Sequence, residues 1–239
     1  MNPSERPLCI LVTGEPVPAT LEKRGSFAEL LQNVAARAWT GSWLVVDCRR
    51  PGRLPAPTSL AGLVVTGSPH SVTDREPWVL NGEAYLADVV AAGVPVLGVC
   101  FGHQMLAQAL GGRVARNPRG REIGTVELAL HADDPLFRDD ERSFRVNMSH
   151  VDTVVELPAS AEIVGSTKLD ACAAVRFGER AWGVQFHPEF DREIVGHYAM
   201  ARADSLREEG LDPDAIAAAA SDAQPGARVL LRFVDLLNS

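Results

Sequence analysis

Short, continuous apolar segments alternate with amphipathic segments through the first half of the chain, and this alternation constrains the fold more than any other feature. Uninterrupted apolar strands are typical of a sheet that is covered on both faces. Strands that alternate with helices predict a parallel sheet with right-handed crossovers. We expect strands over 8–14, 43–48, 60–66 and 94–99, and helices over 26–39 with Ser26 as N-cap, 82–93 and 101–112.

The pattern changes after residue 120, where short strands are separated by turn residues. They predict an antiparallel or mixed extension of the sheet, over 124–130, 143–148, 152–158, 161–167, 171–177 and 181–186. From Asp191 onward the chain reads as helix, with a break expected at Pro225-Gly226. We therefore expect an α/β fold with a mixed, mostly parallel sheet flanked by helices. A single domain over 1–239 would have a core over about 8–190 and a helical C-terminal extension over 191–239.

Charge and cysteine usage exclude several classes of function. The net charge of -8 argues against a nucleic acid as the main partner. The cysteines are scattered and form no Cys-x-x-Cys pair, so we expect no metal, no cofactor and no disulfide framework. The N-terminal apolar run is too short for a signal peptide, and no segment is long enough to span a bilayer. These features predict a cytoplasmic protein without a membrane partner.

Cys100 ends an apolar strand and lies between Gly98 and Gly102. Small neighbours permit a sharp strand-to-helix turn of the kind that holds a nucleophile in strained dihedral angles. The free amides and dipole at the start of a helix stabilise a thiolate. The amide of Phe101 could donate to an oxyanion, and Gln104 shares a helix face with the cysteine. The alternative is a buried core cysteine at a tight turn.

A thiol nucleophile needs a base, and His187 at the end of a later apolar strand is the candidate. Glu189, two residues on, would point to the same side and could orient the imidazole. Gly67 and Ser68 form a turn after another strand, and their amides could face the same pocket. Open α/β sheets place their sites at such strand ends. Surface turns are the alternative for both segments.

Four segments together resemble one family. "GVCFGHQ", "FHPE" and "VVTGSPHSV" resemble the nucleophile, histidine and oxyanion segments of class I, triad-type glutamine amidotransferases. "MSHVDTV" is similar to a segment of their GMP synthase branch, and the resemblance covers about residues 8–190. It implies a flavodoxin-like fold and an enzyme that attacks the side-chain amide of glutamine through a cysteine. A glutamyl thioester would form, and ammonia would leave.

The resemblance also implies residue roles. Cys100 would be the nucleophile, His187 the general base and then acid, and Glu189 the residue that orients it. The other matched positions would form the oxyanion hole (Gly67, Ser68, Phe101) or hold the glutamine (Gln104, Ser149, His150). The sequence departs from the family where Gly-Ser-Pro replaces the common Gly-Gly-Pro, because serine adopts positive φ less readily than glycine.

Several functions remain open at this point. The chain has no Ser-Gly-Gly-x-Asp-Ser or P-loop segment, so an amidotransferase would need a separate synthetase subunit for its unknown ammonia acceptor. The C-terminal helices are candidates for docking that subunit or for a homodimer contact. A standalone hydrolase of γ-glutamyl peptides or amines would use the same triad. It would differ by an open pocket beyond the leaving nitrogen. A binding module and a generic cysteine hydrolase are further alternatives.

Other polar residues and segments are weaker candidates for a functional role. His70 and His103 adjoin the predicted pocket, and Asp152 could tie down the turn after Ser149 and His150. The charge-rich stretch over 133–145 predicts a solvated loop, as does the stretch from Asn117 to Gly124, whose arginines could otherwise meet an acidic substrate.

Overall fold

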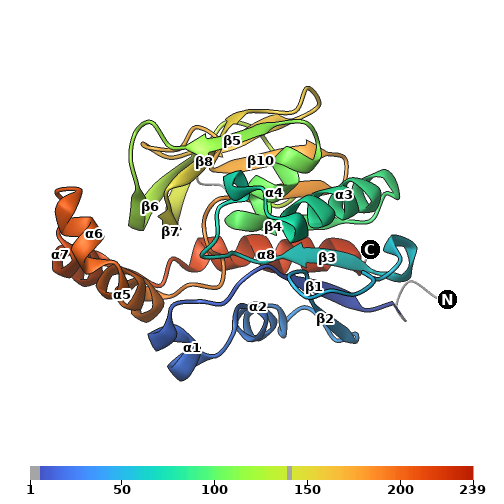
Figure 1. The fold of residues 1–239 in the computed structure, drawn as a ribbon, viewed down its shortest axis with the longest axis horizontal. Coiled ribbons are helices and arrows are strands. Elements are labelled where there is room, and N and C mark those ends of the chain that lie inside the picture. The colour runs from blue at the N-terminus through green and yellow to red at the C-terminus, as the bar shows by residue number, and fades with distance from the viewer. Residues whose placement is uncertain (1–5, 139–141, 239) are drawn as a thin grey trace.

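A large mixed sheet organises the molecule, which the computed structural model describes over residues 6–138 and 142–238 (Figure 1). Its strands lie in the order β2 (Trp43–Asp47), β1 (Leu8–Val12), β3 (Gly62–Val65), β4 (Val96–Val99), β11 (Ala181–Val184), β10 (Ala174–Gly178), β9 (Glu162–Ser166), β6 (Glu122–Leu130) and β7 (Ser143–His150). In this order, neighbouring strands from β2 to β11 pair in parallel, and neighbouring strands from β11 to β7 pair antiparallel. The predicted mixed, mostly parallel α/β sheet is therefore confirmed.

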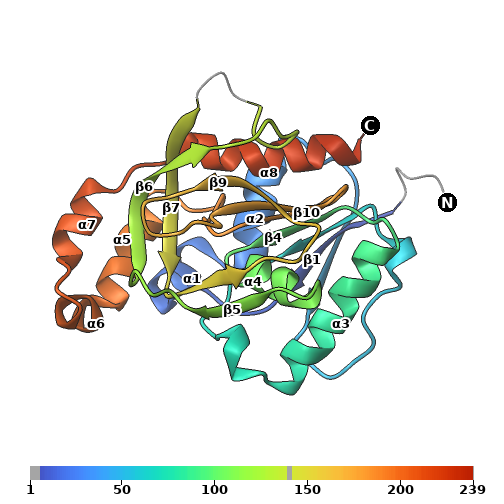
Figure 2. The ribbon, with the colours of Figure 1, turned by 90° about the horizontal axis from the view of Figure 1, so that it is seen from above.

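Helices cover both faces of the sheet. α2 (Phe27–Ala35) and α8 (Gln224–Leu237) pack on one face, and α3 (Pro77–Ala91) and α4 (Phe101–Ala109) pack on the other. Figure 2 shows α8 and α3 on opposite sides of the strands. Alternate residues of β1 enter the two cores, with Ile10 on the α8 side and Leu11 on the α3 side. This double burial explains the continuous apolar strands in the sequence.

The predicted N-cap of α2 is present as a full capping box. The Ser26 hydroxyl accepts from the Glu29 amide at 3.3 Å, and the Glu29 carboxylate accepts from the Ser26 amide at 2.8 Å. The helix that follows presents Ala28 and Leu31 to the sheet.

The C-terminal segment forms four helices: α5 (Arg192–Ala201), α6 (Ala203–Glu208), α7 (Pro213–Ala219) and α8. Figure 1 shows α5, α6 and α7 together at one end of the molecule. The predicted break at Pro225-Gly226 is wrong, because the chain leaves helix over 220–223. Pro225 lies in the first turn of α8. A backbone N–H at this position has no acceptor within the helix, so a proline, which has no N–H, does not disrupt it.

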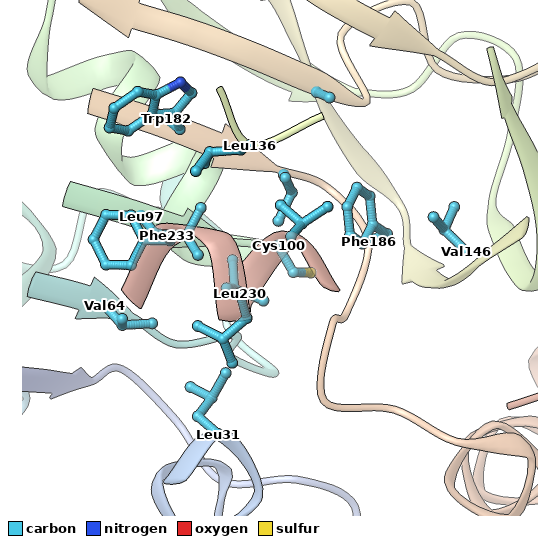
Figure 3. Close-up of a cluster of buried hydrophobic side chains, with 14 of the residues drawn as sticks. Leu31, Val64, Leu97, Cys100, Leu136, Val146, Trp182, Phe186, Leu230 and Phe233 are labelled. Carbon is cyan, nitrogen blue, oxygen red and sulfur yellow. The ribbon is translucent and has the colours of Figure 1, made fainter. Parts of the chain in front are cut away.

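α8 belongs to the main hydrophobic core. Its apolar face buries Val229, Leu230 and Phe233 in the same cluster as the strands β1, β3 and β4. Figure 3 draws Leu230 and Phe233 among Val64 and Leu97 of the sheet. A segment that the sequence assigned to an extension beyond residue 190 therefore completes one face of the sheet.

Some elements were not predicted. α1 (Pro18–Arg24) precedes α2, and short 3₁₀ turns span Pro57–Ser59 and Val72–Asp74. β5 (Arg113–Arg116) pairs with β8 (Asp152–Glu156) in a separate two-stranded sheet, so the prediction that β8 extends the main sheet is wrong. No helix within the described ranges is both long and apolar enough to cross a membrane.

The stretch over 133–145 is only partly a solvated loop. Residues 139–141 lie outside the described residues. Before them, Leu136 and Phe137 are buried, and buried Asp134 accepts from the Trp182 indole at 3.0 Å. This segment therefore closes the core beside β11.

Candidate active site

The segments predicted to form the site meet at the carboxyl ends of neighbouring parallel strands. β4 lies between β3 and β11 in the sheet. Gly67 follows β3, Cys100 follows β4 and His187 follows β11. The topology therefore places these three residues at one edge of the sheet, as expected for an open α/β fold.

Cys100 occupies a sharp, strained turn between β4 and α4. Its φ of 51° and ψ of -103° are unusual for a residue with a side chain. The Cys100 amide donates to Val184 O at 2.8 Å, which ties the turn to β11. A Cβ on Gly98 would lie 2.5 Å from Gly102 O, so the turn can close only because this position has no side chain. The geometry confirms the strand-to-helix turn predicted from the sequence.

His187 and Glu189 form a buried pair beside the cysteine. The two side chains are joined by a bond of 2.8 Å between His187 Nδ1 and Glu189 Oε1. Because Nδ1 donates to the carboxylate, Nε2 is the ring nitrogen that is available to the Cys100 sulfur. The imidazole stacks on Phe190 with a centroid distance of 3.9 Å, and Phe27 lies parallel to it at 6.1 Å. These contacts fix the plane of the ring.

The electrostatics favour a charged pair between Cys100 and His187. Burial raises the pKa of the Cys100 thiol, but the His187 charge, its hydrogen bond and the charge of His150 outweigh this effect, so the pKa is lowered. Burial lowers the pKa of His187, but the Glu189 carboxylate and the Cys100 thiolate outweigh it and raise the pKa well above its usual value. The two shifts together favour a thiolate beside an imidazolium.

Cys100 should therefore react selectively with a small electrophile near neutral pH. Because its pKa is lowered, its thiolate persists as the pH falls, and reactivity declines only when the pH drops through that lowered value. Burial raises the pKa of the Cys9 thiol to about 12 and those of Cys48 and Cys172 to about 11. Peptide mapping after iodoacetamide treatment at about pH 6.5 should find Cys100 modified and the others intact. Labelling of Cys100 that rises only above about pH 8, as for a free thiol, would contradict this electrostatic description.

The turn after β3 packs directly against the pair. A Cβ on Gly67 would lie 2.9 Å from His187 Cε1, so glycine lets the loop approach the imidazole. Gly67 O accepts from the Thr13 hydroxyl at 3.0 Å, and the Ser68 hydroxyl donates to Thr13 O at 2.8 Å. Neither Gly67 nor Ser68 has a positive φ. Serine in place of the family's second glycine therefore causes no backbone strain here.

The residues predicted to hold a substrate line a cavity of about 430 Å³ next to Cys100. The residues of the predicted site that face it are Ser68, Cys100, Phe101, Gln104, Ser149 and His150. Gln104 is anchored at the cavity wall, because its amide donates to Asp152 O at 2.8 Å and to Gln185 Oε1 at 3.0 Å. The Asp152 carboxylate accepts from Ser71 Oγ and thereby joins the turn after β7 to the loop after β3.

His150 is buried among carboxylates that the sequence did not reveal. Its Nδ1 lies 2.9 Å from Asp152 O, and its Nε2 lies 3.2 Å from Glu122 Oε2 and 3.8 Å from Asp170 Oδ2. Burial lowers the pKa of His150, but the hydrogen bond to Glu122 and the charge of Asp170 outweigh it and raise the pKa. The raised pKa favours the protonated form of a second buried histidine near Cys100. The strand pairing of β6 with β7 brings Glu122 opposite His150, and no local sequence pattern signals this pair.

Of the two other histidines that the sequence placed near the pocket, His70 lines the larger cavity and His103 is buried in the core. Burial, reinforced by the charge of His150, lowers the pKa of His103 to about 3, and its ring packs against Phe177 at a centroid distance of 5.5 Å. His70 is exposed and lies 3.2 Å from a Glu76 carboxylate oxygen. No group of three or more His, Cys, Asp and Glu side chains in the part of the chain that the structure describes could hold a metal ion.

A second cavity, of about 320 Å³, lies on the His187 side of Cys100. Cys100, Ser68, Ser149 and Arg202 line both cavities, so the sulfur lies where they meet. The lining of the second cavity is mostly apolar and comes from the segment before α1, from α2 and from α5: Pro16, Val17, Pro18, Phe27 and Tyr198. We refer to it below as the histidine-side cavity.

Asn147 holds the histidine segment in place and was not predicted. Its carbonyl accepts from the His187 amide at 2.9 Å, and its side-chain amide donates to Phe190 O at 2.8 Å and to Ser221 O at 3.1 Å. Its Oδ1 accepts from Thr125 at 2.7 Å. One buried side chain thus joins β7, the turn after β11 and the segment before α8. Their separation along the sequence hides this link.

The curated relatives of this chain include GMP synthases. The chain is 41% identical over 138 residues to a "GMP synthase [glutamine-hydrolyzing]" from Synechocystis sp., an alignment that covers 56% of this chain and 24% of that protein. A GMP synthase from Vibrio campbellii is 43% identical over 130 residues and is covered to the same 24%, against 54% of this chain. The chain thus spans about a quarter of the length of these curated relatives.

Solved structures extend the likeness to nearly the whole fold. A glutamine amidotransferase from Thermotoga maritima superposes with a TM-score of 0.76 at 23% identity, covering 97% of this chain and 99% of that one. One from Methylobacillus flagellatus gives a TM-score of 0.70 at 22% identity, covering 96% and 94%. These structures show a shared fold. The family model "Glutamine amidotransferase class-I" matches residues 45–203, and the chain therefore belongs to the class-I glutamine amidotransferases.

Proposed function

We propose that this protein hydrolyses the side-chain amide of glutamine through Cys100, His187 and Glu189. The Cys100 thiolate attacks the amide carbonyl, and His187 donates a proton to the departing nitrogen as the C–N bond breaks. Ammonia leaves, and a glutamyl thioester remains. A water molecule, deprotonated by His187, then attacks the thioester carbonyl and releases glutamate, which restores the thiol. Glu189 keeps the imidazole in the tautomer that these steps need.

The proposal rests mainly on one observation: a cysteine in a strained strand-to-helix turn lines the same cavity as a histidine that is itself bonded to a buried carboxylate. An inert core cysteine would need neither of these partners. The amides of Gly67, Ser68 and Phe101 are the candidates for stabilising the oxyanion. Because Phe101 begins α4, its amide has no acceptor within the helix. Gln104, Ser149 and His150 would hold the rest of the glutamine.

A standalone γ-glutamyl hydrolase is the second candidate, and the histidine-side cavity favours it. Because His187 would protonate the leaving nitrogen, the leaving group must occupy the side of Cys100 that His187 faces. The 320 Å³ cavity on that side offers room for a group larger than ammonia, and its largely apolar wall suits an amine or peptide. In an amidotransferase with a separate synthetase subunit, the same opening would instead be covered by the partner, which would receive the ammonia.

A substrate panel separates the two candidates. The protein would be incubated with glutamine, γ-glutamyl peptides and γ-glutamyl amines while glutamate and the released ammonia or amine are followed. Glutamine turnover that Cys100→Ala abolishes and the control Cys48→Ala keeps would support the first candidate. Preferred turnover of peptides or amines would support the second. If no substrate is turned over and a diazoketone analogue of glutamine fails to label Cys100, both are refuted.

The ammonia acceptor follows from neither the site nor the fold. The GMP synthases that the chain resembles are about four times as long as the matched region, and an amidotransferase role for this chain would require a synthetase to receive its ammonia. We infer that α5–α7 at the end of the molecule are a candidate contact for that subunit or for a second copy of the chain. Gel filtration with multi-angle light scattering of the purified protein would test the homodimer.

A further inference from the structure

Arg202 is a cation beside Cys100 for which the described residues supply no acidic partner. It lines both cavities, and its Nη1 is buried without a hydrogen bond. The other arginines that line the larger cavity, Arg121 and Arg116, each have the Glu209 carboxylate as a neighbour. Arg121 forms a two-pronged bond with Glu209, at 2.8 and 3.0 Å, and Arg116 is exposed, with a nitrogen 3.9 Å from the same carboxylate. A buried guanidinium nitrogen without an acceptor is costly, unless a ligand supplies one.

The position of Arg202 is set by an aromatic stack that reaches His187. Arg202 lies over the Tyr198 ring, 4.8 Å from its centroid, and the two residues are one helical turn apart at the end of α5. Tyr198 packs on Phe190 at 4.7 Å, and Phe190 packs on His187 at 3.9 Å. The guanidinium therefore has a fixed place relative to the proposed general base.

The charges around Arg202 leave it available to an anion. Burial lowers its pKa and the charge of Arg121 adds to this, whereas Tyr198 and the Cys100 thiolate oppose it. An arginine keeps its proton at such a site, so the charge persists. Glu15 lines the histidine-side cavity as well, but its carboxylate lies 3.6 Å from Arg49. Besides His187, which the Cys100 thiolate and Glu189 already accompany, Arg202 is thus a cation of that cavity that an incoming carboxylate would meet.

We propose that Arg202 binds a carboxylate of the substrate and thereby favours amides that carry this carboxylate over amides that lack it. This inference rests on the proposed amide hydrolysis at Cys100. The carboxylate has two sources. It is the α-carboxylate of the glutamyl half, or it is a carboxylate on the leaving half, as in a γ-glutamyl amino acid. The planar guanidinium suits either, because it can donate two parallel hydrogen bonds to one carboxylate.

Reaction with two electrophiles tests the proposal apart from turnover. A diazoketone analogue of glutamine carries the α-carboxylate, whereas iodoacetamide is neutral. If Arg202 binds the α-carboxylate, Arg202→Gln should slow labelling of Cys100 by the diazoketone by roughly ten- to a hundredfold and leave labelling by iodoacetamide within about twofold. Arg202→Lys, which keeps the charge but not the planar fork, should lie in between. If Arg202 binds a carboxylate of the leaving half, both labelling rates should stay within about twofold of the wild type. Arg207→Gln on α6, whose side chain is exposed, is the matched control.

Turnover by wild type and Arg202→Gln then identifies the source of the carboxylate. The substrates are glutamine, 4-aminobutanamide, γ-glutamylglycine and γ-glutamylmethylamine. A rise in KM for glutamine but not for 4-aminobutanamide, which lacks the α-carboxylate, assigns the glutamyl half. In that case diazoketone labelling falls as well. A rise for γ-glutamylglycine but not for γ-glutamylmethylamine assigns the leaving half, and diazoketone labelling is then unchanged.

Failure of the Arg202 proposal can be told apart from failure of the proposed amide hydrolysis. If the wild type reacts with both electrophiles and Arg202→Gln keeps its KM for all four substrates, Arg202 binds no substrate carboxylate and the proposal is overturned, while amide hydrolysis stands. Equal losses on all four substrates, including 4-aminobutanamide, would also overturn it, because they indicate a general disturbance of the site. If neither turnover nor diazoketone labelling occurs in the wild type, the proposed hydrolysis fails, and this inference fails with it.

Discussion

Replacing His187 with glutamine should lower kcat for the amide substrate by roughly 10⁴-fold, as for the loss of one member of a catalytic triad. The variant removes both the base and the positive charge that stabilises the Cys100 thiolate. Since the His187 charge and hydrogen bond lower the pKa of Cys100, that pKa should rise in the variant. Steady-state kinetics would measure the first effect, and the pH dependence of iodoacetamide labelling the second.

The matched control for this variant is His131→Gln. His131 is on the surface, where its ring bonds to Ser166 at 2.7 Å, and it lines neither cavity beside Cys100. Its replacement should leave kcat within about twofold of the wild type, since surface changes rarely perturb a fold. If the His187 variant kept more than about a tenth of the wild-type kcat, another group would have to be the base, because the loss of a triad base costs far more.

Gly98→Ala should damage both stability and activity. A Cβ at this position would lie 2.5 Å from Gly102 O, 2.6 Å from Gly102 C and 2.7 Å from the His103 amide nitrogen. All three atoms belong to the backbone of the Cys100 turn and cannot move aside as a flexible side chain could. We expect a loss of about 3 kcal/mol in the free energy of unfolding, or a Tm lower by roughly 6 to 12 °C.

The same change should displace the cysteine. Because α4 begins in the turn that Gly98 faces, relief of the overlap would move Cys100 away from His187, and kcat should fall by roughly a hundredfold. Gly178→Ala is the control, since no heavy atom lies within 4 Å of its added Cβ. Thermal melts and kinetics of both variants would be compared. A Gly98 variant that melts and reacts like the Gly178 variant would show that the turn has more room than its geometry indicates.

The sequence predicted best those features that depend on local pattern. β1, β3 and β4 are continuous apolar runs, and each was predicted within a few residues of its bounds. Gly98 and Gly102 around Cys100 indicated the sharp turn, because only small residues fit there. The class-I fold and family were also predicted, since four separate motifs fit one pattern.

Features that depend on distant contacts were missed. Glu122 meets His150 only after β6 and β7 pair, and Asp170 reaches it from the segment between β9 and β10, so nothing in the residues beside His150 indicates these neighbours. β5 is too short and too polar to suggest a strand, and it becomes one through pairing with β8. Pro225 looked like a helix breaker because a proline disrupts a helix interior, whereas here it begins one.

The stack that joins His187 to Phe190, Tyr198 and Arg202 orients the imidazole when the chain folds, before a ligand binds. The imidazole cannot turn out of its plane without displacing Phe190, which is itself pressed against α5 through Tyr198. The entropy lost in orienting this ring is therefore lost when the chain folds, and is not lost again at each encounter with a ligand. Substitutions that shorten the stack should loosen the imidazole, even at Tyr198, whose ring centroid lies 6.4 Å from that of His187.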